Sequence, residues 1–239
     1  MNLREKYYTE SLYPFQDGVL NIVKKSGAPF YLTGGTALSR GYYQHRFSDD
    51  LDLFVNDDVA YGSNVERLFY AFKSAQTAGL FAIDYQRVRR YEQLTQIFLI
   101  QETRDERLTL KIDVVNDVAS HYGGVCDHPL LGKLDNWRNM LSNKLAAVFR
   151  YEAKDIADIW AIAKHERFDW YSMLAEAKTK DAGVEPIALF EIFGSLPQEA
   201  FAMIKWRIPV TFDEFSREIR QIADDIFRER RNSLYSEEK

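Results

Sequence analysis

The chain has 239 residues, and its 31 Lys and Arg residues against 36 Asp and Glu residues give a formal net charge of −5. Hydrophobic residues make up 46% of the sequence, which is enough to bury a core, so extensive disorder is not expected. The acidic balance argues against a non-specific DNA-binding protein, because a nucleic acid would need a local basic surface or bound cations. The single cysteine, Cys126, excludes an intrachain disulfide and a cysteine-based zinc site.

The sequence contains no segment that predicts export or membrane insertion. Its first residues, MNLREKYYTESLY, lack the apolar stretch of a secretion signal. No run approaches the roughly 18 apolar residues that a membrane span requires. We therefore predict a cytoplasmic protein with no membrane partner.

The first half of the chain predicts a mixed α/β fold with helices flanking the sheet. Apolar residues at helical spacing predict the first helix, and Gly27 and Pro29 follow it as helix-ending residues. Alternation of polar and apolar residues predicts half-buried strands. In chain order, the predicted elements are a helix at 12–23, a strand at 30–32, a helix at 36–43, a strand at 50–55, a helix at 65–78, and strands at 81–89, 94–102 and 108–115.

The second half predicts a helical bundle with few strands. The predicted helices are at 137–150, 154–165, 170–178, 186–193 and 212–230. Gly, Pro and Asp cluster in the intervening segment GGVCDHPLLGKLD, which is typical of a boundary between domains. We therefore predict an α/β domain over residues 1–125 and a helical domain over residues 126–239.

A glycine pair at the end of the first predicted strand indicates an anion-binding turn. Gly34 and Gly35 lack a Cβ atom, so their backbone can approach a ligand closely. They precede a predicted helix, whose free N–H groups and dipole favour a phosphate group. Thr36 adds a hydroxyl group at the same place.

Three aspartates on predicted strands indicate a magnesium site. Asp50 and Asp52 are two residues apart on one strand, so both carboxylates project from the same face. Such a pair is tolerable around a divalent cation, and Mg²⁺ typically uses one or two carboxylates with substrate phosphate oxygens. Asp113 would complete the set if its strand lies beside theirs, and three acids with a phosphate-binding turn predict phosphoryl transfer with two metal ions. The competing interpretation is that these aspartates only solvate exposed strand faces.

Four sequence elements resemble, in the same order, those of a known enzyme family. The glycine pair followed by an Asp-hydrophobic-Asp strand is similar to the DNA polymerase β-like nucleotidyltransferases. The fuller runs resemble the AbiEii/AbiGii toxin branch of that superfamily, and they are GGTAL, RFSDDLDLF, SNKLAAVFR and AKDIADIW. Two departures are Gln44-His45-Arg46, where that branch often has Gly-His-Arg, and the additional Asp49.

The resemblance implies the polymerase β-like nucleotidyltransferase fold, use of an NTP with Mg²⁺, and the toxin role in a bacterial toxin–antitoxin or phage-defence pair. The acceptor hydroxyl would be that of a tRNA 3′ end or of a protein, and a cognate antitoxin would be a partner. Asp50, Asp52 and Asp113 would hold the metal, and Lys144 and Asp158 would be catalytic with them. The predicted nucleotide-binding residues are Gly34, Gly35, Thr36, Arg46, Ser48, Lys144 and Arg150.

Other residues allow simpler interpretations. Asp155 is placed on a helix where a structural ion pair with Arg150 or Lys154 is the preferred role. His45 is expected at the surface or capping the core, since no histidine spacing indicates a metal site.

The role of two arginines and the activity of the protein also allow alternative interpretations. Arg89 and Arg90 could contact RNA, although charged runs are usually just solvated. The alternative functions are a nucleotidyltransferase acting on a small molecule such as an aminoglycoside, and a catalytically inactive nucleotide-binding module.

Overall fold

The computed structural model describes residues 2–103 and 106–237 of the chain. It forms two compact units, each assembled from more than one stretch of sequence. The first unit consists of Met1–Ala37, Ser48–Ala119 and Gly124–Asp135. The second unit consists of Leu38–Phe47, Ser120–Gly123 and Asn136–Lys239.

The first unit is built on a mixed sheet, which has eight strands within the described ranges. Its order is β3-β5-β6-β2-β1-β8-β7, and β4 also pairs with β5. Strand β2 runs parallel to β6 and antiparallel to β1, whereas β1 and β8 are parallel. The strands are β1 (Tyr31–Thr33), β2 (Leu51–Asn56), β3 (Ala82–Ile83), β4 (Arg89–Arg90), β5 (Leu94–Glu102), β6 (Arg107–Asp117), β7 (Cys126–His128) and β8 (Gly132–Leu134).

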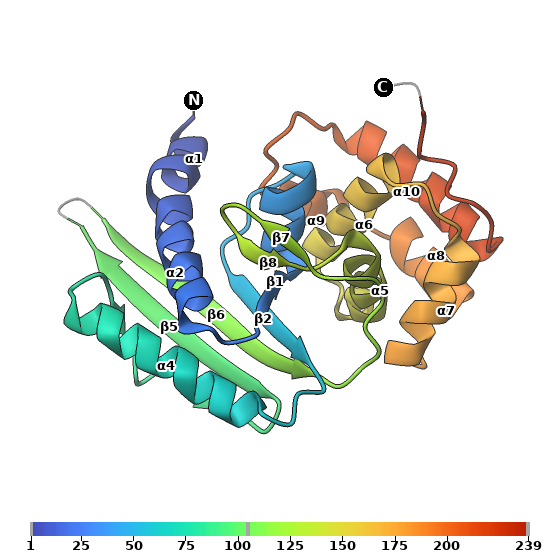
Figure 1. Ribbon diagram of the computed structural model, residues 1–239. Coiled ribbons are helices and arrows are strands. Elements are labelled where there is room, and N and C mark those ends of the chain that lie inside the picture. Colours follow the sequence, from blue (N-terminus) through green and yellow to red (C-terminus); the bar gives the residue numbers. More distant parts are fainter. Residues whose placement is uncertain (1, 104–105, 238–239) are drawn as a thin grey trace. The chain divides into compact units, whose positions relative to one another are not determined.

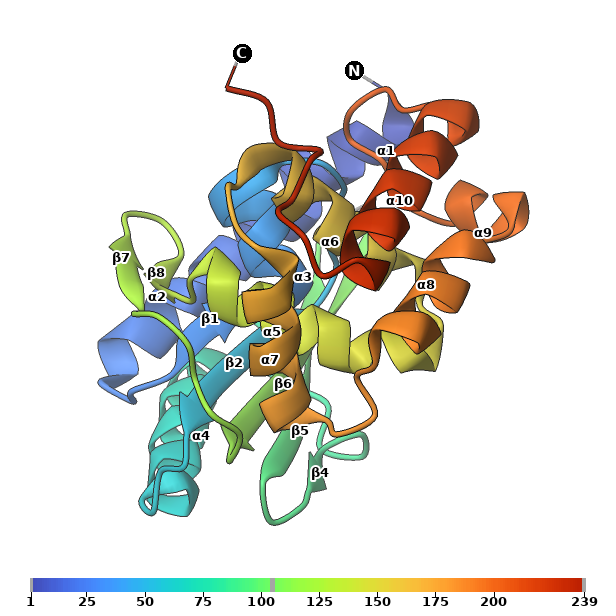
Figure 2. The same ribbon diagram turned by 90° about the vertical axis from the view of Figure 1, so that its right-hand side faces the viewer.

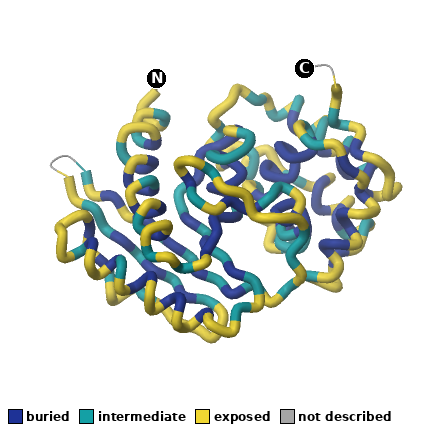
Figure 3. Tube along the Cα trace, viewed as in Figure 1, coloured by how far each residue is buried: buried dark blue, intermediate teal, exposed yellow. Residues whose placement is uncertain are grey.

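The alternating sequence of the central strands gives the sheet one apolar and one polar face. Leu51 and Leu53 are buried, and their register partners Ile112 and Val114 on β6 are buried on the same side. Figure 3 shows this alternation of buried and intermediate residues along the strands. Helices α2 and α4 pack beside each other against this apolar face (Figure 1), which leaves the intervening polar residues on the opposite face.

The helices of the first unit include a long N-terminal rod that is continuous from Leu3 to Ser26. It ends at Gly27, whose φ of +69° is the left-handed conformation that favours glycine. The helices of this unit are α1 (Leu3–Lys6), the π-helical η1 (Tyr7–Leu12), α2 (Tyr13–Ser26), α3 (Gly34–Thr36) and α4 (Tyr61–Thr77).

The second unit is helical and surrounds an aromatic core. Trp160, Trp170, Phe193 and Phe215 are fully buried there, and Trp160 meets Phe215 edge-on with ring centroids 5.4 Å apart. Helix α8 packs along α10 (Figure 2). The helices are α5 (Trp137–Ala147), η3 (Val148–Arg150), α6 (Ala153–His165), α7 (Trp170–Lys180), α8 (Pro186–Gly194), α9 (Gln198–Ala202) and α10 (Phe212–Phe227).

A segment from between β1 and β2 also belongs to this helical unit. It carries most of the π-helical turn η2 (Ala37–Tyr43) and continues to Phe47. Phe47 N–H donates to Lys205 O at 2.8 Å, and Arg207 N–H donates to His45 O at 3.0 Å. These backbone bonds fix the segment to the stretch between α9 and α10.

The structure confirms the predicted mixed α/β class, and it differs from the sequence analysis in several details. The predicted strand at 81–89 is two short strands, β3 and β4, separated by a turn, and the last long helix ends at Phe227 rather than at 230. The rod before residue 12, helix α9 and the hairpin β7–β8 were not predicted. Each hairpin strand is only three residues long, too short for a period to be recognised.

The two units also divide the chain differently from a single cut after residue 125. The hairpin β7–β8 joins the sheet through Leu134 and Leu32, so the first unit extends to Asp135. The residues 38–47 lie in the second unit because their bonding partners are there. In the described part of the chain, no helix combines the length and the apolar character needed to cross a membrane.

Candidate functional site

A row of directly paired polar residues crosses the polar face of the sheet. Asp52 on β2 is the register partner of both Thr33 on β1 and Asp113 on β6. Asp113 is in turn opposite Gln96 on β5, which is opposite Arg89 on β4. Directly opposed residues project from the same face, so these five side chains share one side of the sheet. We call this set the polar row.

Asp52 lies against the glycine turn that follows β1. Gly34 has a φ of +68°, and a Cβ atom built there would lie less than 3.0 Å from Asp52 Oδ2. Any larger residue at this position would therefore collide with the carboxylate as well as strain the backbone. The glycine is required here because the chain reverses beside the acid.

Asp113 forms an ion pair with a lysine of the same strand. Lys111 Nζ is 2.6 Å from Asp113 Oδ2, and Gln96 Nε2 donates to Asp113 Oδ1 at 3.0 Å. Burial alone would lower the pKa of Lys111, but the bond to Asp113 and the charges of Asp113, Asp50 and Asp52 raise it. The charged form of Lys111 is thus stabilised by all three of the predicted metal-binding carboxylates.

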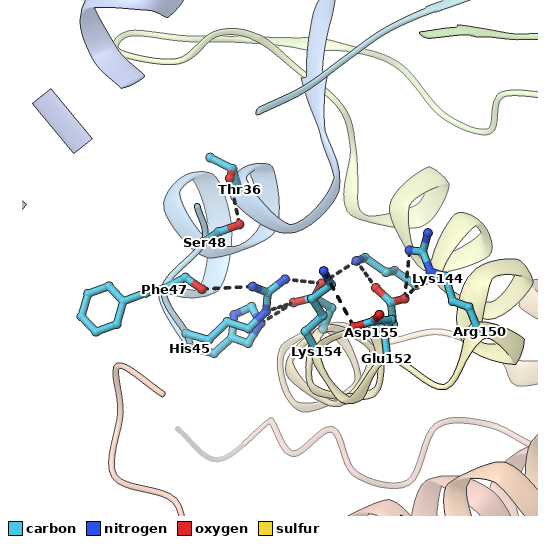
Figure 4. A network of polar contacts seen from close by, with 11 residues as sticks. Thr36, His45, Phe47, Ser48, Lys144, Arg150, Glu152, Lys154 and Asp155 are labelled. Carbon is cyan, nitrogen blue, oxygen red and sulfur yellow. Dashed lines mark hydrogen bonds and ion pairs between the residues drawn. The ribbon is translucent and has the colours of Figure 1, made fainter. Parts of the chain in front are cut away.

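The hydroxyl groups of Thr36 and Ser48 hold the segment that leads into β2. Thr36 Oγ1 donates to Asp50 O at 2.5 Å and is 2.9 Å from Ser48 Oγ (Figure 4). Both side chains are buried, Thr36 completely. The structure therefore gives these two residues a role in placing Asp50, and their assignment to nucleotide binding stays a prediction, as does that of Gly35.

Asp49 faces away from Asp50, as its place in the alternation predicts. Tyr8 donates a short hydrogen bond to Asp49 Oδ1, and Gln16 Nε2 donates to Asp49 O at 2.9 Å. Both partners belong to the N-terminal helical rod. Asp49 therefore anchors that rod to the start of β2 and is not part of the polar row.

The donor chemistry of the polar row fits a hard divalent cation. Asp52 and Asp113 present carboxylate oxygens on adjacent strands, which lie about 4.8 Å apart. Within the described ranges, no three His, Cys, Asp or Glu side chains form a group ready to hold a metal ion. Mg²⁺ binds through one or two carboxylates together with substrate phosphates, so two acids meet its requirement from the protein.

The remaining predicted residues form a second group, inside the helical unit, around the carboxylate of Asp158. His45 Nε2 is 2.8 Å from Asp158 Oδ1, and Arg46 contacts both carboxylate oxygens, at 2.7 and 2.8 Å. Lys144 Nζ is 2.7 Å from Asp158 Oδ2. The Asp158 side chain is completely buried, so water contributes nothing to its solvation.

A second aspartate extends this group toward solvent. Lys144 Nζ also bonds Asp155 Oδ1 at 2.5 Å, and Arg150 contacts Asp155 Oδ2 at 2.9 Å (Figure 4). The structural ion pair predicted for Asp155 and Arg150 is confirmed. The Arg150 side chain is 60% exposed, whereas that of Lys144 is 10% exposed. We refer to His45, Arg46, Lys144, Arg150, Asp155 and Asp158 as the Asp158 cluster.

The protonation states of the cluster follow from its charges. Burial would raise the pKa of Asp158, but Arg46, Lys144 and the bond from His45 hold it well below its usual value. Burial would lower the pKa of Lys144, but Asp158 and Asp155 raise it. Burial lowers the pKa of His45, and Arg46 and Lys144 act in the same direction, outweighing Asp158. The cluster therefore contains charged Asp158, Arg46 and Lys144 with a neutral histidine.

Three residues of these two groups were not predicted as participants. His45 was expected at the surface or capping the core, but it is completely buried against Asp158. The expected surface position is wrong, because His45 Nε2 pairs with the buried carboxylate of Asp158. Gln96 contacts Asp113 because β5 pairs with β6, which no spacing in the sequence indicates. Lys111 is two residues from Asp113 on β6, so the alternation of the strand places both side chains on one face.

Comparison with known proteins agrees with this architecture. Residues 22–232 match the profile of a family described as nucleotidyl transferase AbiEii toxin, type IV toxin–antitoxin system. A crystal structure of a "putative nucleotidyltransferase" from Helicobacter pylori aligns with a TM-score of 0.60 at 20% identity, covering 92% of this chain and 96% of that one. The crystal structure of JHP933 from the same species aligns with a TM-score of 0.56 at 20% identity, covering 89% and 90%. A search of curated proteins found no match. At this identity the two structures establish similarity of fold.

Gly34→Ala tests the close approach of Asp52 to the glycine turn. The substitution adds the left-handed backbone cost of about 1–2 kcal/mol and a clash with the carboxylate. Gly79→Ala is the matched control, because Gly79 has a φ of +74° and nothing within 4 Å of its added Cβ. We expect Gly34→Ala to lower the free energy of unfolding in urea more than Gly79→Ala does. Equal losses would show that the Asp52 contact does not constrain this position.

Asp158→Ala tests the buried charge cluster. Removing one partner of a buried ion pair leaves uncompensated buried charge, so we expect the free energy of unfolding to fall by about 3–5 kcal/mol. Glu66→Gln, which breaks the exposed pair with Arg90, is the control and should change it little. Urea denaturation of both variants measures the difference. A loss no larger than that of the control would contradict the role given to Asp158.

The neutral state of His45 predicts a pH dependence of stability. Because burial lowers its pKa, unfolded His45 binds a proton as the pH falls through about 6.5 while folded His45 does not. The contribution of neutral His45 to the free energy of unfolding is therefore present above that pH. It is lost below that pH, with a slope of up to about 1.4 kcal/mol per pH unit. Urea titrations of wild type and His45→Gln between pH 7.5 and 5.5 should show a smaller loss for the variant. Identical slopes would mean that His45 is not held neutral beside Asp158, Arg46 and Lys144.

Proposed function

Because this chain belongs to the nucleotidyltransferase AbiEii toxin family of type IV toxin–antitoxin systems, we propose that it transfers a nucleoside monophosphate from an NTP to an acceptor hydroxyl with Mg²⁺. The acceptor we propose is the 3′ end of a tRNA. Membership of the family implies a cognate antitoxin as partner.

The observation that carries this proposal is the pairing of Asp52 with Asp113 across β2 and β6. Two carboxylates in register on one sheet face repel each other, and Lys111 offsets this repulsion only in part. A solvated strand face does not require a glycine with a positive φ beside one of the acids. The arrangement is therefore better explained as a cation site than as ordinary surface polarity.

In the proposed reaction, the acceptor hydroxyl gives up its proton to solvent and its oxygen bonds to the α-phosphorus, while the bond from the α-phosphorus to the bridging β-phosphate oxygen breaks and pyrophosphate leaves. Bound Mg²⁺ would supply Lewis acidity at the phosphate oxygens and at the attacking hydroxyl. Asp52 and Asp113 would hold the ion, with Asp50 supported by Thr36 next to them. When the ion binds, the Lys111 ammonium group would leave Asp113 and contact solvent or a phosphate group instead.

We assign Asp158 a positioning role. A general base must come within hydrogen-bond reach of the proton that it removes, and a group with a strongly lowered pKa is a poor acceptor for it. Asp158 is completely buried, has a strongly lowered pKa, and holds two cations and a histidine. It is therefore suited to fixing Arg46 and Lys144 in place. Its predicted importance for activity would then reflect the order that it imposes on these side chains.

Asp52→Asn tests the proposed activity. The amide removes one anionic ligand, so we expect nucleotide transfer to fall by at least about 10²-fold. Purified protein is incubated with labelled NTPs, Mg²⁺, and total RNA or an aminoglycoside panel, and labelled product is quantified. Asp127→Asn is the control, because Asp127 is 89% exposed on β7.

Growth provides the second measurement. Induced wild-type protein should arrest growth, and Asp52→Asn should relieve the arrest while Asp127→Asn does not. Labelled RNA would support the tRNA acceptor, whereas labelled drug with unlabelled RNA would reject it. Wild-type protein that labels nothing, or Asp52→Asn protein as active as wild type, would overturn the proposal.

A further inference from the structure

The arginines in the segment 87–90 are separated by the structure into three environments. Arg90 lies over the Phe69 ring on the apolar side of the sheet and pairs with Glu66. Arg89 projects from the opposite face, where its Nη1 donates to Gln86 O and Val88 O at 2.7 and 2.9 Å. Arg87 differs from both, because within the described ranges its exposed guanidinium makes no hydrogen bond or ion pair.

The Arg87 guanidinium is stacked on an aromatic ring. Its Cζ atom lies 3.7 Å from the centroid of the Phe98 ring. Phe98 is opposite Lys111 and two residues from Gln96 along β5, so it projects from the face that carries the polar row. Figure 2 shows β4 and β5 paired at this edge of the sheet. The stack thus lies on the same face of the sheet as Asp52 and Asp113.

We propose that Arg87 and Phe98 form a stacking site for a nucleobase. The inference rests on the proposed function, because it extends the proposed cation site on this sheet face to a surface that also binds a nucleobase. A guanidinium stacked on a ring has its other planar face available, and unpaired bases are commonly bound on arginine planes and aromatic rings. The base would belong either to the unpaired end of an RNA acceptor or to the incoming NTP.

The spacing of the strands suits a nucleotide that extends from the acids to the stack. Asp52 on β2 and Phe98 on β5 are separated by two strand spacings, about 10 Å in the direction across the sheet. Arg89, the last member of the polar row, adds positive charge on the same face, suited to a phosphate group. In an acidic protein, this basic and aromatic edge is the kind of local surface that nucleic-acid binding requires.

Three variants separate stacking from charge. Arg87→Ala removes both, Arg87→Lys retains the charge without the planar group, and Phe98→Leu removes the ring while retaining an apolar side chain. Arg90→Ala is the matched control, since it loses the same charge three residues further along the chain, where β4 directs the side chain to the opposite face of the sheet. Thermal unfolding establishes that each variant is folded, and Arg87→Ala, at an exposed site, keeps the test valid if Phe98→Leu is unstable.

Binding is measured in two arms. One uses fluorescence anisotropy with a labelled short single-stranded RNA, and the other uses calorimetry with α,β-methylene NTP analogues and Mg²⁺. We expect Arg87→Ala and Phe98→Leu to weaken binding in at least one arm by about 5-fold or more, which corresponds to the smallest usual effect of one lost base stack. Arg87→Lys should also weaken binding in that arm, and Arg90→Ala should bind as the wild type does.

The arms identify the source of the base and separate this inference from the proposed function. Weaker binding of RNA alone assigns the stack to the acceptor, and weaker binding of the NTP analogue alone assigns it to the incoming nucleotide. Unchanged binding by Arg87→Ala in both arms overturns the stacking site, even if Asp52→Asn abolishes transfer. Weaker binding by Arg87→Ala in a protein that transfers no nucleotide would retain the stacking site and reject the proposed function.

Discussion

The register between β2 and β6 is the constraint on which the rest of the candidate site depends. It places Asp52 opposite Asp113 while Leu51 and Leu53 enter the core beside Ile112 and Val114. A shift by one residue would turn the leucines toward the polar face and the acids toward helices α2 and α4. The burial of apolar side chains on one face thus fixes the carboxylates on the other. The glycine turn makes room for the Asp52 carboxylate, and Lys111 offsets part of the negative charge beside Asp113.

The two groups of polar residues use charge in different ways. On the sheet, acids accumulate with one partly exposed lysine, which leaves negative charge for a cation to neutralise. In the helical unit, Asp158 is surrounded by cationic partners and buried completely, so its charge is already matched. Buried matched charges fix geometry at the expense of reactivity. This contrast supports a chemical role for the sheet acids and an organising role for Asp158.

Much of the fold was predictable, because long amphipathic elements carry their period in the sequence. The strands that contain Asp52 and Asp113 and the helices that contain Lys144 and Asp158 were placed correctly to within a few residues. The hairpin β7–β8 was not predicted, since its three-residue strands are stabilised by pairing with β1 rather than by their own pattern. The complete burial of His45 was not predicted, because it depends on a charged partner 113 residues away.

The sequence by itself determined the class of fold, the alternation that aligns the acids on one face, and the motifs of a nucleotidyltransferase toxin. These properties are local, or repeat along a few consecutive residues, and so can be recognised without contacts. Only the tertiary structure decided that Asp113 lies in register with Asp52, that Arg46 and Lys144 share Asp158, and that Arg87 stacks on Phe98. Such pairings join residues of different structural segments, and they are fixed by how those segments pack together rather than by any neighbouring residue.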